Sequence, residues 1–205
     1  MNAQGALAEF VEVMERLEPE PQHTRHVAFL AVRLFDETQP LHRLGPAERV
    51  LLEGAARLHD VGWPISEGGA GHHKLSARLI RQQNWRHLGR DEVEVVALVA
   101  RYHRKALPGP GHEEFDRLPR PRQQVVRNLA ALLRLADALD RSHLQRVRDL
   151  KVRATDRHLE ISLLADEVPG REIAGAERKG DLARDVFDRA LSFRWLPQRR
   201  AAPAG

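Results

Sequence analysis

The clearest candidates for chemistry in this sequence are an adjacent histidine and aspartate, His59 and Asp60, at the expected end of a helix. An imidazole and a carboxylate that emerge together from a buried helix end cost free energy unless another group compensates them. A divalent cation would do so, because both side chains are metal ligands. The helix is expected to be buried on one face, since apolar residues recur at spacings of three and four. These residues are Leu51, Leu52, Ala55, Ala56 and Leu58.

Other candidate ligands stand where further expected helices should present an apolar face. Asp137, for example, follows Leu133 by one helical turn, so its carboxylate should point along the apolar stripe. Metal sites in all-α proteins are built from ligands on several helices of one bundle. The sequence therefore predicts a shared metal site. The candidates besides His59 and Asp60 are His26, His72, His73, His103 and Asp137.

The pattern of apolar residues predicts the elements that must position these ligands. Helices are expected at about residues 4–18, 23–36, 46–60, 72–83, 91–102 and 121–143. Glycine and proline predict loops at 62–71 and 106–121. Alternating apolar and polar residues predict a hairpin of strands at 147–154 and 158–164, followed by a helix at 182–191.

These elements predict a mainly α fold, a helical bundle with a small C-terminal α+β appendage of strand, strand and helix. We expect a helical domain over residues 1–145, the appendage over 146–196 and a flexible tail over 197–205, with fraying already from Leu196. The chain has 205 residues, 42% of them hydrophobic, which suffices for one good core and a small added part.

Composition excludes several classes of site. The sequence has no cysteine, which rules out disulfides, zinc-thiolate sites and cysteine nucleophiles. It has no apolar segment of signal-peptide type and no apolar run approaching the roughly 18–20 residues that span a bilayer, so we expect a cytoplasmic protein without a membrane partner. The net charge is +4 and arginine dominates the basic residues. This is compatible with an ordinary mixed-sign surface or with affinity for phosphate-rich anions.

The ordered series H…HD…H…H…D resembles the HD superfamily of metal-dependent phosphohydrolases. The closer similarity is to the C-terminal region of the exopolyphosphatase/guanosine pentaphosphate phosphatase family, over about residues 20–195. The actin-like phosphatase domains that usually precede this region in that family are not in this sequence, so chemistry housed in them is not carried over. The similar stretches are Leu58–Trp63 (LHDVGW), Gly71–Lys74 (GHHK), Ala100–Pro108 (ARYHRKALP), Ala130–His143 (AALLRLADALDRSH) and the strand–strand–helix tail.

The resemblance implies a metal ion held by His26, His59, Asp60 and Asp137. A second ion could be held by His72 and His103, with Asp60 as the bridging carboxylate; His73 remains an alternative to His72. Imidazole and carboxylate ligands suit one or two divalent ions of Mn, Fe, Co, Ni or Zn, and Mg less well.

The resemblance also implies hydrolysis of a phosphomonoester or phosphoanhydride, in a nucleotide or polyphosphate-like substrate, by metal-bound hydroxide. We expect Asp60, His103 and Lys74 to take part in catalysis. Cationic side chains next to the ligands could neutralise phosphate charge. They are Lys74, Arg101, Arg104, Lys105 and Arg141.

Less specific interpretations stay open. Asp137 could form an ordinary helix ion pair with Arg134 or Arg141. The whole chain could be a non-catalytic module that binds polyphosphate or nucleotide, or one that dimerises for regulation, and a homodimer is open in either case. RNA binding through the arginine-rich surface is the weakest alternative, and nucleic acid is not the expected partner. Trp63 is assigned to the core, and several other histidines are assigned to the surface. These are His23, His42, His87, His112 and His158.

Overall fold

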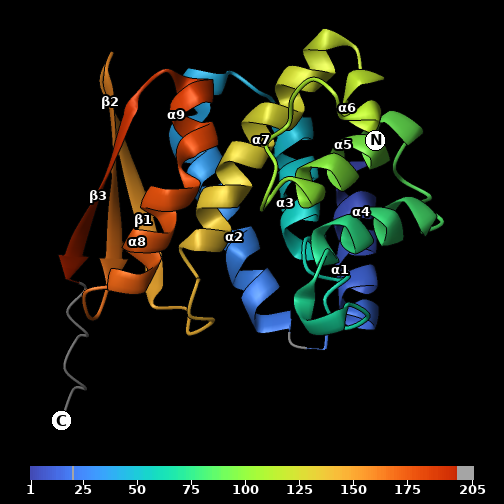
Figure 1. The fold of residues 1–205 in the computed structure, drawn as a ribbon, viewed down its shortest axis with the longest axis horizontal. Helices are drawn as coiled ribbons and strands as arrows, with labels where there is room; N and C mark the ends of the chain where they lie inside the picture. Colours follow the sequence, from blue (N-terminus) through green and yellow to red (C-terminus); the bar gives the residue numbers. More distant parts are fainter. Residues whose placement is uncertain (20, 198–205) are drawn as a thin grey trace.

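The computed structural model describes residues 1–19 and 21–197, and it is a mainly helical protein with a small sheet at one end (Figure 1). This confirms the fold class expected from the sequence. In the described part of the chain, none of the helices combines the length and apolar character needed to cross a membrane. The helices are α1 (Ala3–Leu17), α2 (Pro21–His42), α3 (Pro46–Leu58), the short 3-10 turn η1 (Glu67–Gly69), α4 (His72–Gln82), α5 (Arg90–Arg101), α6 (Glu113–Asp116), α7 (Arg120–Ala138), α8 (Gly170–Lys179) and α9 (Asp181–Phe187); the strands are β1 (Val147–Ala154), β2 (His158–Ala165) and β3 (Ala190–Pro197).

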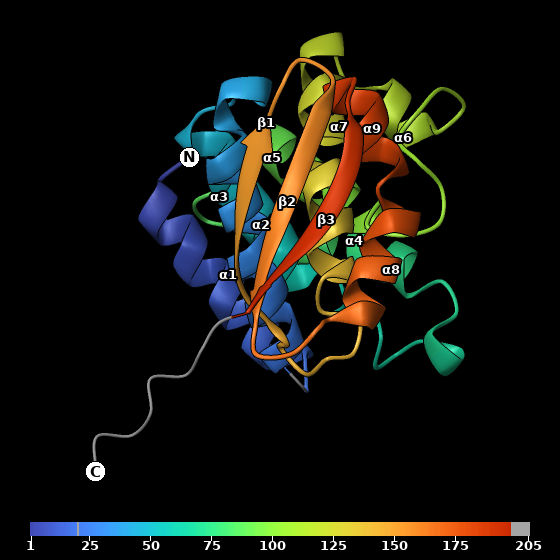
Figure 2. The same cartoon turned by 90° about the vertical axis from the view of Figure 1, so that its left-hand side faces the viewer.

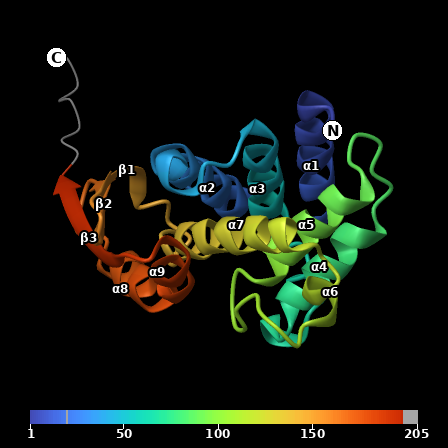
Figure 3. The same ribbon diagram turned by 90° about the horizontal axis from the view of Figure 1, so that it is seen from above.

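Helix α7 is the central element of the fold. It contacts α2, α3 and α5 in the bundle and also α8 and α9 from the C-terminal part. Seen from above, it runs between α1–α3 on one side and α4 and α6 on the other (Figure 3). The sequence accounts for this position, because α7 is buried almost continuously from Val126 to Ala138. A helix that is apolar around most of its circumference has to lie inside the molecule.

The sheet completes the C-terminal part and differs from the predicted appendage. Strands β1 and β2 form the expected antiparallel hairpin, but β3 then pairs with β2 in parallel (Figure 2). A parallel pair needs a long crossover connection, and α8 and α9 supply it. The helix predicted at 182–191 therefore ends at Phe187, and residues 196 and 197 belong to β3 rather than to a tail. The rest of the predicted tail, 198–205, lies outside the described residues.

The C-terminal part packs closely on the bundle. Two side chains of α2 hold the free edge of β1: Arg33 donates to Asp149 (2.7 Å) and to the Leu150 carbonyl (3.1 Å), and Glu37 accepts from the Val152 N–H (2.9 Å). Buried apolar side chains from the helices and from both strands of the hairpin form one continuous cluster. The predicted domain boundary at residue 145 stays a prediction.

The contact between α1 and α3 depends on a glycine. A Cβ built on Gly54 would lie 2.3 Å from the ring of Phe10, which is fully buried. We expect Gly54→Ala to lower the free energy of unfolding by about 1–3 kcal/mol, because the packed ring cannot move aside. Urea denaturation measures this change. Gly109→Ala is the matched control, since a Cβ there meets no atom within 4 Å; an equal loss in both variants would contradict this account.

Candidate metal centre

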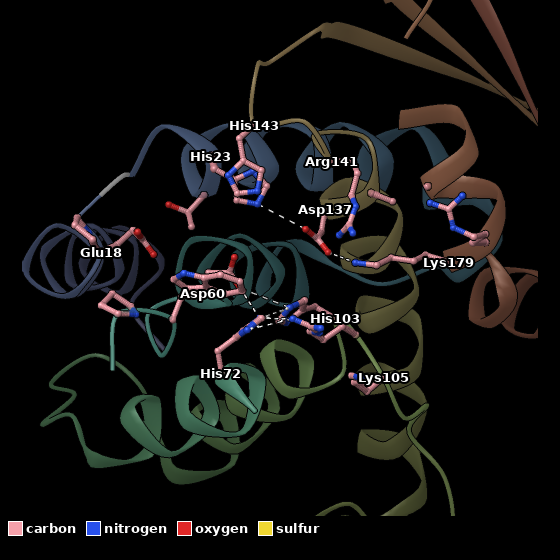
Figure 4. Close-up of a pocket in the computed structure, with 18 residues that line it drawn as sticks. Glu18, His23, Asp60, His72, His103, Lys105, Asp137, Arg141, His143 and Lys179 are labelled. Atoms are coloured by element: carbon pink, nitrogen blue, oxygen red, sulfur yellow. Dashed lines mark hydrogen bonds and ion pairs between the residues drawn. The ribbon is translucent and has the colours of Figure 1, made fainter. Parts of the chain in front are cut away.

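A cavity of about 720 Å³ opens where the ends of several helices meet (Figure 4). Its walls come from the start of α2 and α4 and from the ends of α3, α5, α7 and α8, together with the loops that follow them. Ionisable side chains line it on every side. They include His23, Asp60, His72, His103, Arg104, Lys105, Asp137, Arg141, His143, Arg178 and Lys179.

Two groups of side chains in and beside this cavity could each hold a cation. The first contains His23, His59 and Asp137, and the second contains Asp60, His72 and His103. Within each group the candidate ligand atoms all lie within 4.8 Å of one another. The two groups adjoin, because Asp60 faces His59 with Oδ2 (3.6 Å to Nε2) and faces the other two histidines with Oδ1.

The distances show how closely these atoms converge. Asp137 Oδ1 lies 3.6 Å from His23 Nε2 and 3.9 Å from His59 Nε2. Asp60 Oδ1 lies 3.0 Å from His72 Nε2 and 3.6 Å from His103 Nε2. Five helix ends thus direct imidazole and carboxylate atoms at one small region.

A close approach between two chain segments brings Asp60 to His72. The Gly62 N–H donates to Ser76 Oγ (2.9 Å), which holds the turn after α3 against α4. A Cβ on Gly62 would lie 2.5 Å from the Ser76 backbone nitrogen and 2.6 Å from the His72 carbonyl oxygen. Glycine is therefore required for the two segments to lie this close.

Each histidine is oriented by a hydrogen bond at Nδ1. Three of them donate Nδ1–H to the carbonyl three residues earlier, and His23 directs Nδ1 to Asp140 Oδ2 at 2.8 Å. In a neutral imidazole such a bond fixes the tautomer and leaves the Nε2 lone pair free for a ligand. The three carbonyl contacts are His59 to Ala56 (2.7 Å), His72 to Gly69 (2.9 Å) and His103 to Ala100 (2.7 Å).

Several of the converging atoms lack a hydrogen-bond partner among the described residues. His23 Nε2, His59 Nε2 and Asp60 Oδ1 are buried and have no hydrogen-bond partner among residues 1–19 and 21–197. The Nε2 atoms of His72 and His103 face each other at 3.2 Å, although Nδ1 carries the proton in both rings. Buried polar atoms without partners are costly. A divalent ion that accepts imidazole and carboxylate ligands would satisfy all of them, so the side chains fit a metal centre.

The charge states support the same interpretation for the two carboxylates and His103. Burial alone would raise the pKa of Asp60, but His59, His72 and His103 hold it below its usual value. Burial would also raise the pKa of Asp137, but Lys179 and His23 hold it well below its usual range. Both carboxylates are therefore ionised. Burial lowers the pKa of His103 to about 3, which keeps this imidazole neutral, as a metal ligand must be.

The family model of Ppx/GppA phosphatase, domain III, matches residues 10–168 of this chain. The chain belongs to this family. The matched range contains both groups of candidate ligands and ends just before α8. The resemblance to the exopolyphosphatase family that the sequence indicated is thereby confirmed.

The structure of this Ppx/GppA domain brings five of the predicted metal ligands together, namely His59, Asp60, His72, His103 and Asp137. It does not bring His73 with them. The His73 side chain is buried, and its ring centroid lies 5.9 Å from that of His72. Burial lowers the pKa of His73 to about 4. Among the residues that the structure describes, His73 belongs to neither ligand group.

His26 is also outside the cluster, and His23 stands there instead. His26 Nε2 lies 2.9 Å from the Val147 carbonyl oxygen of β1. The assignment of His23 to the surface was wrong, since this side chain is 6% exposed. A signal was available in the spacing, because His23 precedes the buried Val27 by four residues and Leu30 by seven. His26 shares its stripe with Arg33 and Glu37, which face β1.

Of the predicted cationic residues, some line the cavity and others do not. Arg104, Lys105 and Arg141 line the cavity as expected. Lys74 is exposed at the start of α4, and Arg101 pairs with Glu114 (2.8 Å); in the part of the chain that the structure describes, neither lines the cavity. The sequence analysis missed Arg178 and Lys179 because it predicted no helix at 170–179.

Two aromatic rings in the wall were also unforeseen. Trp63 was assigned to the core, but it is 49% exposed and its ring packs on Gly69 and on His72, 4.8 Å between centroids. The His143 ring stacks on His23 with 3.8 Å between centroids. Both rings line the cavity beside the ligand groups.

The two histidines of α2 give a direct test of the centre. We expect His23→Ala to weaken binding of Mn²⁺ by at least about 10-fold, because it removes a ligand atom. His26→Ala should leave the affinity unchanged, since its Nε2 lies at the Val147 carbonyl of β1 and the residue belongs to neither ligand group among the described residues. Equilibrium dialysis with metal analysis of both variants measures this, with thermal melts to show that both are folded. Loss of metal in His26→Ala with retention in His23→Ala would contradict the assignment.

Proposed function

We propose that this Ppx/GppA domain is an HD-type metal-dependent phosphohydrolase. Its substrate would be a phosphomonoester or phosphoanhydride of a nucleotide or a polyphosphate-like anion. The observation that carries the proposal is that, in and beside the cavity, buried imidazole and carboxylate atoms without a hydrogen-bond partner among the described residues adjoin a cationic wall. Membership of a phosphatase family supports the same class of reaction.

In this proposal His23, His59, Asp60 and Asp137 hold one divalent ion. His72 and His103 hold a second, and Asp60 serves both because its two oxygens face different groups. Mn, Fe, Co, Ni or Zn suits this ligand set, and Mg suits it less well. When bound, such an ion activates water and neutralises charge on phosphoryl oxygens.

The remaining side chains of the cavity would bind and orient the anion. Arg104, beside His72 (Nη1 to Nδ1, 3.2 Å), and Arg141 offer guanidinium groups that can contact two phosphoryl oxygens at once. Lys105 adds a third cation on the same wall. Lys74 and Arg101 have no part in this arrangement, because they do not face the cavity. Homodimerisation stays a prediction.

A second candidate function is a binding module without turnover. The observation that favours it is the internal neutralisation of the first group, where His23 and Lys179 both lie against Asp137. Burial would lower the pKa of His23, but the nearby carboxylate of Asp137 and the hydrogen bond to Asp140 raise it to about 9, so the group can be charge-balanced by protons alone. Such a module would bind phosphate-rich anions with strong salt dependence and would release no phosphate.

Phosphate release distinguishes the two functions. We expect the protein to hydrolyse at least one member of a panel of nucleotides and short polyphosphates in the presence of Mn²⁺ or Co²⁺, and a chelator to abolish the activity. Asp60→Asn should lower the rate by at least about 100-fold, because it removes the carboxylate between the two groups. Asp156→Asn, in the exposed β1–β2 turn, is the matched control. Full activity in Asp60→Asn would refute the proposal, and salt-sensitive binding without turnover would favour the module.

The cationic wall makes a separate prediction. Arg104→Ala should raise KM by about 10-fold, since a charge-assisted hydrogen bond to the substrate is lost. Lys74→Ala should have a clearly smaller effect, because Lys74 points to solvent. Steady-state kinetics with a substrate from the panel gives both values. Equal changes in KM would show that the exposed lysine contributes as the sequence analysis supposed.

A further inference from the structure

Helix α8 carries a lysine into the candidate metal centre. Lys179, the last residue of α8, forms an ion pair with Asp137 Oδ2, and the two side chains are 22% and 14% exposed. The close-up shows the lysine reaching Asp137 from the side opposite His23 and His143 (Figure 4). This helix lies beyond the residues that the family model matches.

Two contacts hold α8 in the position that this ion pair requires. Gly175 packs on the end of α7, where a Cβ would lie 3.2 Å from the Ala138 carbonyl oxygen. The buried Glu172 accepts from the Ser142 N–H (3.2 Å), just after the same helix. Glu172, Gly175 and Lys179 are spaced by three and four residues, so they share one face of α8. That face packs on α7, and this packing brings the Lys179 ammonium group to Asp137.

The two oxygens of Asp137 face different side chains. Oδ1 faces His23 and His59, and Oδ2 faces the Lys179 ammonium. A metal ion held on the histidine side and the Lys179 ammonium group on the other oxygen would repel each other, because the two charges would be close and little water would screen them. Lys179 must therefore reduce the affinity of this group for a cation. With a cation in place, the ammonium is better stabilised by an anion in the cavity, which Lys179 also lines.

We propose that Lys179 is the resident counter-ion of Asp137: it weakens cation binding at the His23–His59–Asp137 group and contacts the phosphoryl anion once a cation is bound. The second half rests on the proposed function, whereas the first half does not. Lys105 lines the same cavity but makes no ion pair with Asp137 among the described residues. It therefore separates a direct contact from a general effect of positive charge.

The experiment compares Lys179→Met with Lys105→Met and with Lys151→Met, an exposed lysine on β1. Mn²⁺ affinity is read from the EPR signal of free Mn²⁺ at fixed pH and ionic strength. We expect Lys179→Met to tighten Mn²⁺ binding by about 2- to 5-fold, the effect of one lost, partly buried charge pair. Lys105→Met should show a smaller change and Lys151→Met none.

The second measurement is the affinity of the Mn²⁺-loaded protein for inorganic phosphate. Lys179→Met should weaken it by about 10-fold, and Lys179→Arg should restore most of it, because the guanidinium is also a charged donor. Unchanged or weaker Mn²⁺ binding in Lys179→Met, or an equal gain in Lys105→Met, would overturn the proposal. Thermal melts accompany every variant, and Lys179→Gln repeats the measurement if Lys179→Met is destabilised.

These readouts separate the inference from the proposed function. If Lys179→Met tightens Mn²⁺ binding but the protein hydrolyses no substrate, the role of Lys179 as counter-ion is supported and the phosphohydrolase proposal is refuted. If the protein hydrolyses substrate but Lys179→Met leaves Mn²⁺ affinity unchanged, the phosphohydrolase proposal is supported and the role of Lys179 is refuted.

Discussion

Ionisable side chains that point at one another inside the protein, with some of their atoms left unsatisfied by the described residues, are the constraint on which this structure depends. Nε2 of His23, Nε2 of His59 and Oδ1 of Asp60 are buried without a partner in the described chain. Hydrogen bonds at Nδ1 fix the orientation of the two histidine rings, so their Nε2 atoms cannot turn away to find other partners. Interiors rarely keep such atoms unless a ligand completes them.

The fold delivers these atoms through helix ends. A helix end is where the chain leaves the packed core, so a side chain there can be held rigidly and still reach a cavity. His59 and Asp60 follow α3, His72 begins α4 and Asp137 lies in the last turn of α7. Because α7 contacts elements from both parts of the molecule, it places the end of the bundle next to the C-terminal part.

The C-terminal part is consequently more than a cover for the bundle. Its parallel strand β3 requires a crossover, and the crossover helices have to pass over α7 to reach it. This geometry places Arg178 and Lys179 on the wall of the cavity. The small sheet and the candidate metal centre are thus linked through α8, which joins a structural requirement of the sheet to the charge balance of Asp137.

Much of the site could be predicted from the sequence because its signals are local. His59 and Asp60 are adjacent, Asp137 follows the apolar stripe of its own helix, and the order of the candidate ligands along the chain resembles that of a known superfamily. The hairpin of β1 and β2 was likewise visible in alternating residues. Each of these signals depends on neighbours within one element, and no knowledge of the packing is needed to see them.

The tertiary structure decided what depends on partners distant in sequence. His23 and His26 lie on one helix, and the sequence analysis chose His26 as the ligand and assigned His23 to the surface. The packing of α2 against β1 placed His26 at the strand and His23 at the cavity. Strand β3 exists because β2 offers it hydrogen bonds, and α8, with two glycines among its ten residues, has a weak intrinsic preference for helix. Side-chain type and order were set by the sequence alone, whereas the rotation of each helix, and with it the choice of ligand and counter-ion, was set by what each helix packs against.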